Sequence, residues 1–251
     1  MSHNKTLSTS QLMTAESSND SLNEPSANDP AVPIEDGLAE NMMHAISARF
    51  RGYLPIVVDI ETGGFNPQTD AMLEIAASPV KMNSNGELYC DETFSYHIKP
   101  FEGSNIDSAS LEFTGIDPYH PLRPHQEESL VLKDLFNRVR AEMKLVDCKR
   151  AILVAHNATF DQSFLNAAVE RCAIKRNPFH PFSSFDTATL SGLALGQTVL
   201  AKACMSAKIE FSNDSAHSAA YDTRKTAELF CFIVNRWKEL GGWPLTATSQ
   251  D

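Results

Sequence analysis

The chain has 251 residues, 42% of them hydrophobic, and a formal net charge of −11 at pH 7, a composition typical of a soluble globular protein. No stretch approaches the roughly 18 apolar residues of a membrane span, and the N-terminus lacks the apolar region of a secretory signal, so we expect a cytoplasmic protein with no membrane contact. A net negative charge does not by itself indicate nucleic-acid binding, but local patches of basic residues and bound cations determine the electrostatic potential at a binding site.

Residues 1–38 are predicted to form a disordered, acidic and polar tail. They are rich in Ser, Asn, Asp, Glu and Pro, and the first aromatic residue of the chain is Phe50. Residues 1–45 hold one Lys and seven Asp or Glu, and therefore carry −6 of the net charge. Such a segment cannot bury enough apolar surface to offset the entropy lost on ordering. Residues 39–251 are long enough for one domain with a sizeable core.

The apolar pattern of this domain alternates between strand and helix periods. The expected strands are 55–61, 73–82, 88–100 and 151–156, with a turn at 83–86 joining the second to the third. Apolar residues recur at helical spacing over 131–143, 164–172 and 217–240. A hairpin followed by alternating helices and strands predicts an α/β protein with a mixed sheet and helices on its faces.

The cysteines form no metal-binding or redox motif in the sequence. No two lie within three residues of each other. We expect all of them to be reduced and mostly to fill small spaces in the core, as in a reducing cytoplasm. They are Cys90, Cys148, Cys172, Cys204 and Cys231.

Two carboxylates interrupt the first apolar strand, within PIVVDIETGGF at 55–65. Asp59 and Glu61 are two residues apart, so their side chains share one face of the strand while Ile60 points to the other. Adjacent like charges repel, and a hard divalent cation such as Mg²⁺ or Mn²⁺ relieves that repulsion. The alternative is that both carboxylates lie beyond the core and face water.

Two further carboxylates lie on the apolar stripes of predicted helices. Asp161 ends the motif HNATFD and Asp222 ends HSAAYD, and core-type residues follow each of them at helical spacing. A buried carboxylate must be paired, neutralised or metal-bound. An N-cap would account for Asp161, and pairing with an arginine at the edge of the core or with a backbone donor would account for Asp222. Alternatively, both could meet Asp59 and Glu61 in an oxygen-rich cluster with room for two cations.

His217 precedes Asp222 by five residues. Five helical steps turn the chain by about 500°, so on one regular helix the two side chains would differ by about 140° in direction. We therefore expect Asp222 inside the helix and His217 in the loop or first turn before it. Imidazole ordinarily titrates near pH ~6.5, which suits a general base, whereas a surface or capping role is the plainer interpretation.

These three motifs resemble those of the DEDD exonuclease superfamily: DIE at 59–61, HNATFD and HSAAYD. A histidine five residues before the last aspartate marks the DEDDh branch, and the tyrosine of the other branch would stand at Ser218. Longer runs are similar to the ribonuclease T family from about residue 45 to about residue 245, among them RFRG, LEIAA, GIDP, RNPFHPF, FDTATLSGLALGQTVL and IVNRWKELGGWPL.

The resemblance implies a ribonuclease H-like fold, with a mixed five-stranded sheet flanked by helices. It implies 3′→5′ exonuclease activity that releases 5′-phosphomonoesters and uses two Mg²⁺ ions per active site, with Mn²⁺ as a substitute. The implied substrates are short single-stranded 3′ ends of structured RNA, in tRNA end turnover and maturation of stable RNAs, and single-stranded DNA. The implied catalytic residues are the metal ligands Asp59, Glu61, Asp161 and Asp222 and the general base His217.

The family also stacks the last bases of a 3′ end on phenylalanines. The matching positions are Phe65, Phe113, Phe160 and Phe182. Base–aromatic stacking contributes about 1–3 kcal/mol per base, while core packing is the alternative for each ring. Ala109 departs from the family, which carries a Glu near this pocket, and Glu112 is close but out of register. This departure leaves the preference for the 3′-terminal base open.

The family is homodimeric, and a basic patch of one subunit guides RNA to the active site of the other. The matching positions are Arg49, Arg51, Arg150, Lys175 and Arg176, each of which could instead be a solvated surface charge. Two other functions stay open: a proofreading or repair DNA exonuclease of the same branch, and an RNA-binding module without catalysis. All five catalytic residue types are present, which argues against the second.

Overall fold

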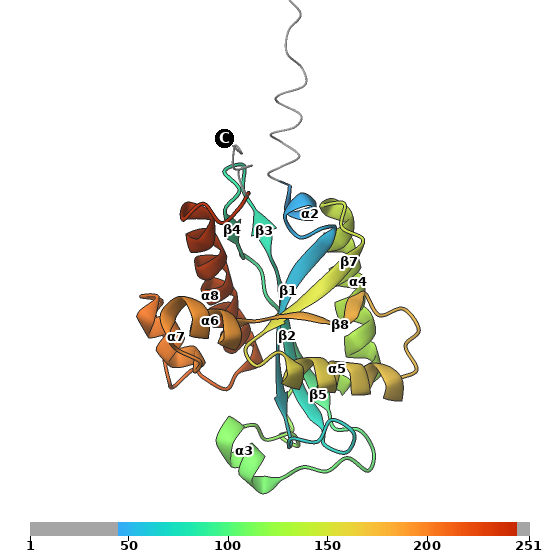
Figure 1. Ribbon diagram of the computed structural model, residues 1–251. Helices are drawn as coiled ribbons and strands as arrows, with labels where there is room; N and C mark the ends of the chain where they lie inside the picture. The colour runs from blue at the N-terminus through green and yellow to red at the C-terminus, as the bar shows by residue number, and fades with distance from the viewer. Residues whose placement is uncertain (1–44, 245–251) are drawn as a thin grey trace, which may run out of the picture. The chain divides into compact units, whose positions relative to one another are not determined.

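A mixed six-stranded sheet forms the centre of the computed structural model, which describes residues 45–244 (Figure 1). In sheet order the strands are β6 (Gln126–Glu127), β5 (Phe94–Lys99), β2 (Met72–Pro79), β1 (Tyr53–Thr62), β7 (Arg150–Ala155) and β8 (Phe179–Asp186). The β1–β2 and β2–β5 pairs are antiparallel, and the β1–β7, β7–β8 and β5–β6 pairs are parallel. The expected α/β class is confirmed, and the sixth strand is the two-residue β6. The tail predicted for residues 1–38 lies outside the described residues.

The predicted hairpin divides into two parts. β3 (Lys81–Met82) and β4 (Leu88–Tyr89) pair across the turn as a separate two-stranded sheet, while β2 and β5 pair in the main sheet. The tip leaves the main sheet because a residue of helix α8 (Ala219–Glu239) forms hydrogen bonds with its backbone: Leu88 N donates to Asn235 Oδ1 at 2.7 Å, and Asn235 Nδ2 donates to Leu88 O at 2.9 Å. The two long strands expected from the sequence are therefore each interrupted.

Helices cover both faces of the sheet (Figure 1). α4 (Glu128–Leu145) and α5 (Thr159–Arg171) pack on one face, and α8 (Ala219–Glu239) packs on β1 and β2 from the other. α6 (Thr187–Leu195) and α7 (Leu200–Ser206) pack on α8, while α2 (Ile46–Arg49) precedes β1 and α3 (Ser108–Thr114) lies at the lower end of the view. Within residues 45–244, every helix is too short or too polar to cross a bilayer.

The core joins the two helical layers to the sheet through β1. Residues 54–58 of this strand are buried on both faces, which accounts for its unbroken apolar sequence. Three fully buried rings dock one helix each: Phe136 on α4, Phe164 on α5 and Phe230 on α8. Burying each ring contributes about 1.5–3 kcal/mol. This packing fixes the N-terminal ends of α5 and α8 beside the last residues of β1.

Candidate active site

The end of β1 still pairs with β2 but no longer with β7. Its parallel register with β7 runs from Tyr53 to Val57, so the residues beyond have no partner on β7. A side chain takes that place at Ile60, whose backbone N–H donates to Asp161 Oδ1 at 3.0 Å. Asp59 and Glu61 flank Ile60 and are half-buried. Asp161 is thus placed against the strand between the two carboxylates that the sequence singled out.

Asp161 lies in the first turn of α5 and is only 3% exposed. It is not the N-cap, which is Ala158. The turn that starts the helix is fixed instead by Asp186 at the end of β8, whose Oδ1 accepts hydrogen bonds from the N–H of Asn157 at 2.9 Å and of Ala158 at 3.3 Å. Asp161 is therefore free to direct its carboxylate toward β1.

Asp222 lies in the first turn of α8, and His217 lies outside the helix, as expected. His217 has a left-handed backbone with φ of 68°, and its N–H donates to Asp222 Oδ2 at 2.8 Å. The other oxygen, Asp222 Oδ1, is buried and has no hydrogen-bond partner among residues 45–244. Because a buried carboxylate oxygen without a partner is costly, this atom marks a place where a cation fits.

Glu61, His217 and Asp222 converge on one point. One ligand atom of each lies within 4.8 Å of those of the other two. Burial raises the pKa of Asp59, and the charges of Asp161, Glu61 and Asp222 raise it further. Burial, followed by Asp222 and Glu74, raises the pKa of Glu61 to about 7. Such crowding of carboxylates is unfavourable in the absence of positive charge, and hard divalent cations prefer this donor set.

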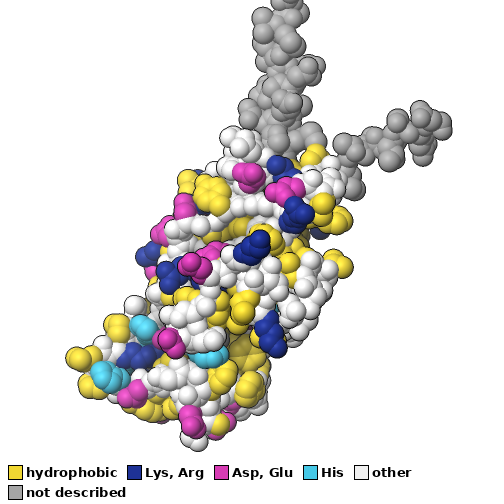
Figure 2. Space-filling model, turned by 90° about the vertical axis from the view of Figure 1, so that its left-hand side faces the viewer, with side chains coloured by type: hydrophobic (Ala, Val, Ile, Leu, Met, Phe, Trp, Pro, Cys, Tyr) yellow, Lys and Arg dark blue, Asp and Glu magenta, His cyan; other side chains and the backbone are white. Residues whose placement is uncertain are grey.

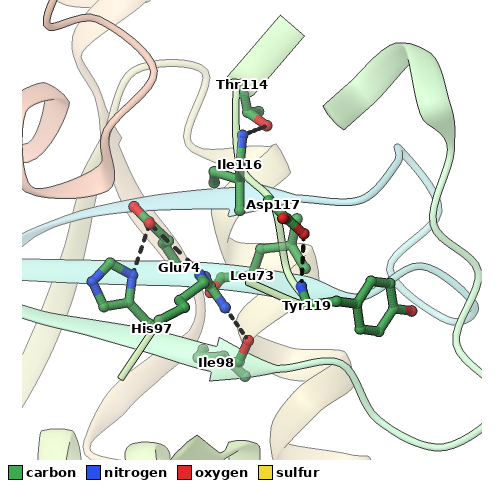
Figure 3. A network of polar contacts seen from close by, with 9 residues as sticks. Leu73, Glu74, His97, Ile98, Thr114, Ile116, Asp117 and Tyr119 are labelled. Atoms are coloured by element: carbon green, nitrogen blue, oxygen red, sulfur yellow. Dashed lines mark hydrogen bonds and ion pairs between the residues drawn. The ribbon is translucent and has the colours of Figure 1, made fainter. Parts of the chain in front are cut away.

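Behind this cluster, Glu74 on β2 is the cross-strand partner of Glu61. Its Oε1 lies 2.9 Å from His97 Nδ1 and 3.8 Å from Arg123 Nη2 (Figure 3). The Arg123 guanidinium also donates to the carbonyls of Leu73 at 2.6 Å and Ile98 at 3.0 Å. It thereby anchors the segment that follows α3 to β2 and β5, and so holds α3 next to the site.

A cavity of about 550 Å³ opens beside Glu61. Phe65, Phe113 and Phe160 line it, and the first two are 83% and 67% exposed. The ring of Phe113, on α3, lies 4.1 Å from the imidazole of His217 between centroids. Ala109 lines the cavity as well. Exposed aromatic rings beside a carboxylate cluster suit flat, apolar ligand groups that are attached to a phosphate.

The loop after β1, which presents Phe65, brings the Asp70 side chain close to the backbone of Gly64. A Cβ at Gly64 would lie 2.0 Å from Asp70 Oδ2, so only glycine fits there. Asp70 in turn accepts hydrogen bonds from Asn66 N at 3.0 Å and from Asn105 Nδ2 at 3.0 Å. The second glycine of the pair that follows the two carboxylates is thus required by the fold of this loop.

The other predicted substrate-binding positions lie apart from the cavity. Phe182 is 79% exposed on β8, with its ring 4.6 Å from that of His180. Arg49 has a buried Nη1 that finds no hydrogen-bond partner within the described part of the chain, and its guanidinium carbon lies 4.0 Å from the Trp243 ring centroid. The remaining basic positions, Arg51, Arg150, Lys175 and Arg176, are exposed and precede or begin β1, β7 and β8.

Sequence reasoning missed three residues that shape the site. Glu74 interrupts the apolar run LEIAA just as Asp59 interrupts the first strand, so the same argument could have found it. Asp186 supports α5 from a strand that was not predicted, because FHPFSSFD contains a proline and has no clear alternation. His156 also lines the cavity, with Nδ1 3.0 Å from Thr187 Oγ1 and Nε2 2.8 Å from Thr198 O.

We expect the metal-free protein to lose stability as the pH rises from 4.5 to about 7. The pKa of Glu61 in the folded state, about 7, exceeds its ordinary value of 4.5, so between these values the folded state binds more protons than the unfolded state. Melting temperatures measured in EDTA across this range test the expectation. Glu61→Gln should flatten the dependence, and an equally steep curve for this variant would contradict it.

The sequence matches one known family of proteins over most of its length. A family model for the RNase T exonucleases matches residues 56–230. The chain is 61% identical over 207 residues to ribonuclease T of Vibrio cholerae, covering 82% of this chain and 92% of that protein. It is 60% identical over 201 residues to ribonuclease T of Shewanella putrefaciens, covering 80% and 90%.

Solved structures support the fold independently. E. coli exonuclease I in complex with a dT13 oligonucleotide superimposes with a TM-score of 0.57 at 18% identity, over 76% of this chain and 43% of that one. Its zinc-bound complex with single-stranded DNA gives 0.56 at 19% identity, over 76% and 42%. The chain thus spans less than half of exonuclease I. This likeness confirms the ribonuclease H-like fold.

Proposed function

Because this chain belongs to the RNase T family of exonucleases, we propose that it is a metal-dependent 3′→5′ exoribonuclease that releases 5′-phosphomonoesters. Its proposed substrates are short single-stranded 3′ ends of structured RNA, in tRNA end turnover and maturation of stable RNAs, with single-stranded DNA as a further substrate. One observation carries the proposal: Glu61, His217 and Asp222 converge within 4.8 Å beside a cavity walled by exposed phenylalanines.

The carboxylates fit a pair of Mg²⁺ ions, with Mn²⁺ as a substitute. Hard oxygen donors suit both ions, and the unpartnered Oδ1 of Asp222 gains a partner when a cation binds. We assign Asp59, Glu61, Asp161 and Asp222 as the ligands. When bound, such ions activate water and stabilise the charge that develops on the attacking and leaving oxygens during phosphodiester hydrolysis.

The chain's own residues supply the proton transfer and the orientation. His217 takes the proton of the attacking water as a general base. Its backbone is held by the N–H bond to Asp222, and its ring packs against Phe113, so two contacts restrict where the imidazole lies. Fixing the base in this way reduces the entropy cost of reaching the transition state.

Replacing either exposed ring should weaken binding of the 3′ end. We expect Phe65→Ala and Phe113→Ala each to raise the Kd for a single-stranded 3′ overhang by about 5- to 150-fold, since stacking contributes about 1–3 kcal/mol per base. Fluorescence anisotropy with labelled RNA measures this. Phe232→Ala, an exposed ring on α8, is the matched control. Unchanged binding by both cavity variants would assign these rings another role.

The basic positions lie at the opposite end of the sheet from the carboxylates. Arg51 precedes β1, Arg150 begins β7, and Lys175 and Arg176 precede β8, so they gather where the parallel strands start. The carboxylates stand near the other end of β1, roughly 25 Å along the strand. A patch so far from its own active site suits the homodimer that we propose, in which it serves the partner's site.

Binding of RNA should depend on salt through this patch. We expect Lys175→Ala combined with Arg176→Ala to reduce the slope of log K against log salt by about 1.4, since each phosphate contact to a single strand contributes about 0.7. Lys202→Ala, on α7, is the control. The face in Figure 2 has basic and acidic side chains interspersed, so no general attraction is expected from it. A flat slope for the unaltered protein would contradict the patch.

A digest of 3′-labelled tRNA and a DNA strand of matched sequence tests the function directly. We expect stepwise shortening of both in Mg²⁺, faster for RNA, and none in EDTA. If the protein prefers DNA, it is a DNA exonuclease of the same branch. If it binds RNA without shortening it, it is an RNA-binding module. Sedimentation of the same preparation reports the dimer, and fractionation of cells reports the cytoplasmic location that we propose.

A further inference from the structure

Two cysteines that the nuclease chemistry does not use lie side by side. Cys90 Sγ is 4.0 Å from Cys231 Sγ, although 141 residues separate them in the chain. Cys90 lies between β4 and β5 and is half-buried, whereas Cys231 lies on α8 and is 7% exposed. Bonded sulfurs are about 2 Å apart, so closing this gap requires a movement of only about 2 Å.

The contact between the thiols is held from both sides. Before Cys90, two hydrogen bonds clamp Leu88 to Asn235, which lies one turn of α8 beyond Cys231. After Cys90, the hydroxyl of Ser78 donates to the carbonyl of Glu92 at 2.6 Å. The segment that carries Cys90 is therefore fixed to both α8 and β2, and the two sulfurs remain neighbours in the folded protein.

A cavity of about 420 Å³ gives access to the pair. Both cysteines line it, together with Arg224 and the three acidic residues Asp91, Glu92 and Glu228. The acidic lining disfavours anionic reagents, and it does not oppose a small neutral oxidant. We propose that Cys90 and Cys231 form a thiol–disulfide site, in which hydrogen peroxide oxidises the pair to an intramolecular disulfide.

The two thiols have distinct parts in this reaction. The Cys90 thiolate attacks one oxygen of the peroxide, the O–O bond breaks, and the leaving hydroxide takes a proton to become water. The resulting sulfenic acid on Cys90 is attacked by the sulfur of Cys231, which loses its proton as a second hydroxide leaves. Two thiols and one peroxide thus give one disulfide and two waters.

The order of attack follows from the surroundings of each sulfur. The hydrogen bond between the thiols lowers the pKa of Cys90 and raises that of Cys231. Cys90 is also the more exposed of the two. A more acidic and accessible thiol reacts first, and the buried neighbour resolves it.

Oxidation should be specific to this pair. Full-length protein treated with hydrogen peroxide should lose about 2 Da in intact mass, recoverable with dithiothreitol, and digestion should release one peptide that joins Cys90 to Cys231. Cys90→Ser should abolish the loss. Cys231→Ser should leave a sulfenic acid on Cys90 that dimedone traps, so the two variants report separate steps.

Cys172→Ser is the matched control. Cys172 is also half-buried, but its sulfur faces Glu128 Oε2 at 3.4 Å, and burial together with that carboxylate raises its pKa to about 11. This variant should form the disulfide as the unaltered protein does. The proposal is overturned if no joined peptide forms, if the 2 Da loss persists in Cys90→Ser, or if Cys172 reacts before Cys90. Mass is measured, so the outcome does not depend on nuclease activity.

Discussion

Asp161→Asn is expected to slow RNA hydrolysis by at least about 1,000-fold and to raise the melting temperature of the metal-free protein. The catalytic loss follows from the proposed ligand role, because metal-held charge stabilises such a transition state by several kcal/mol, and about 4 kcal/mol corresponds to 1,000-fold. The fold is retained because the amide oxygen of Asn can still accept the hydrogen bond from Ile60 N. Kinetics with saturating Mg²⁺ measure the first effect.

The gain in stability has an electrostatic cause. Asp161 is buried, and burial raises its pKa well above the ordinary value, while its charge also raises the pKa of Asp59. A neutral amide removes this repulsion, and a gain of about 1 kcal/mol corresponds to about 2–4 °C. Glu170→Gln, exposed on the same helix, should change neither property. An active or destabilised Asp161→Asn protein would remove Asp161 from the proposed metal site.

The sequence predicts those parts of the site that follow from the periodic spacing of apolar residues within one element. The apolar residues that follow Asp161 and Asp222 at helical spacing predict that both face the sheet, and both lie buried in the first turn of their helices. The rotation per helical residue alone predicts that His217 lies outside the helix, and α8 begins at Ala219. Such arguments work because the regular period of a helix or strand fixes the direction in which each of its side chains points.

What the sequence does not predict is set by contacts between distant segments. The hydrogen bonds between Asn235 and Leu88 hold the tip of the predicted hairpin away from the main sheet, and no sequence pattern near either residue predicts them. β8 is an edge strand of the sheet and contains a proline, so its sequence shows no alternation of apolar and polar residues. Its last residue, Asp186, nevertheless fixes the start of α5 through a hydrogen bond. The sulfur contact between Cys90 and Cys231 is of the same kind, since it joins residues 141 apart.

Replacing His217 should lower the catalytic rate less than replacing a carboxylate does, and loss of the general base can be distinguished from loss of metal binding. A positioned general base contributes about 10²–10⁴-fold, so His217→Ala should lower kcat within that range. Because His217 has φ of 68°, alanine there is strained, whereas asparagine accepts the left-handed backbone. His217→Asn therefore keeps the backbone geometry and removes only the imidazole.

If the imidazole is the base, both variants should lose rate to a similar degree while keeping the thermal shift that Mg²⁺ produces. Both retain the backbone N–H that donates to Asp222 Oδ2, so the carboxylate stays in place. Added imidazole should restore part of the rate to His217→Ala, where the ring next to Phe113 is missing. A nearly active His217→Asn protein would show that this residue serves the site through its backbone, and the proton of the attacking water would then need another acceptor.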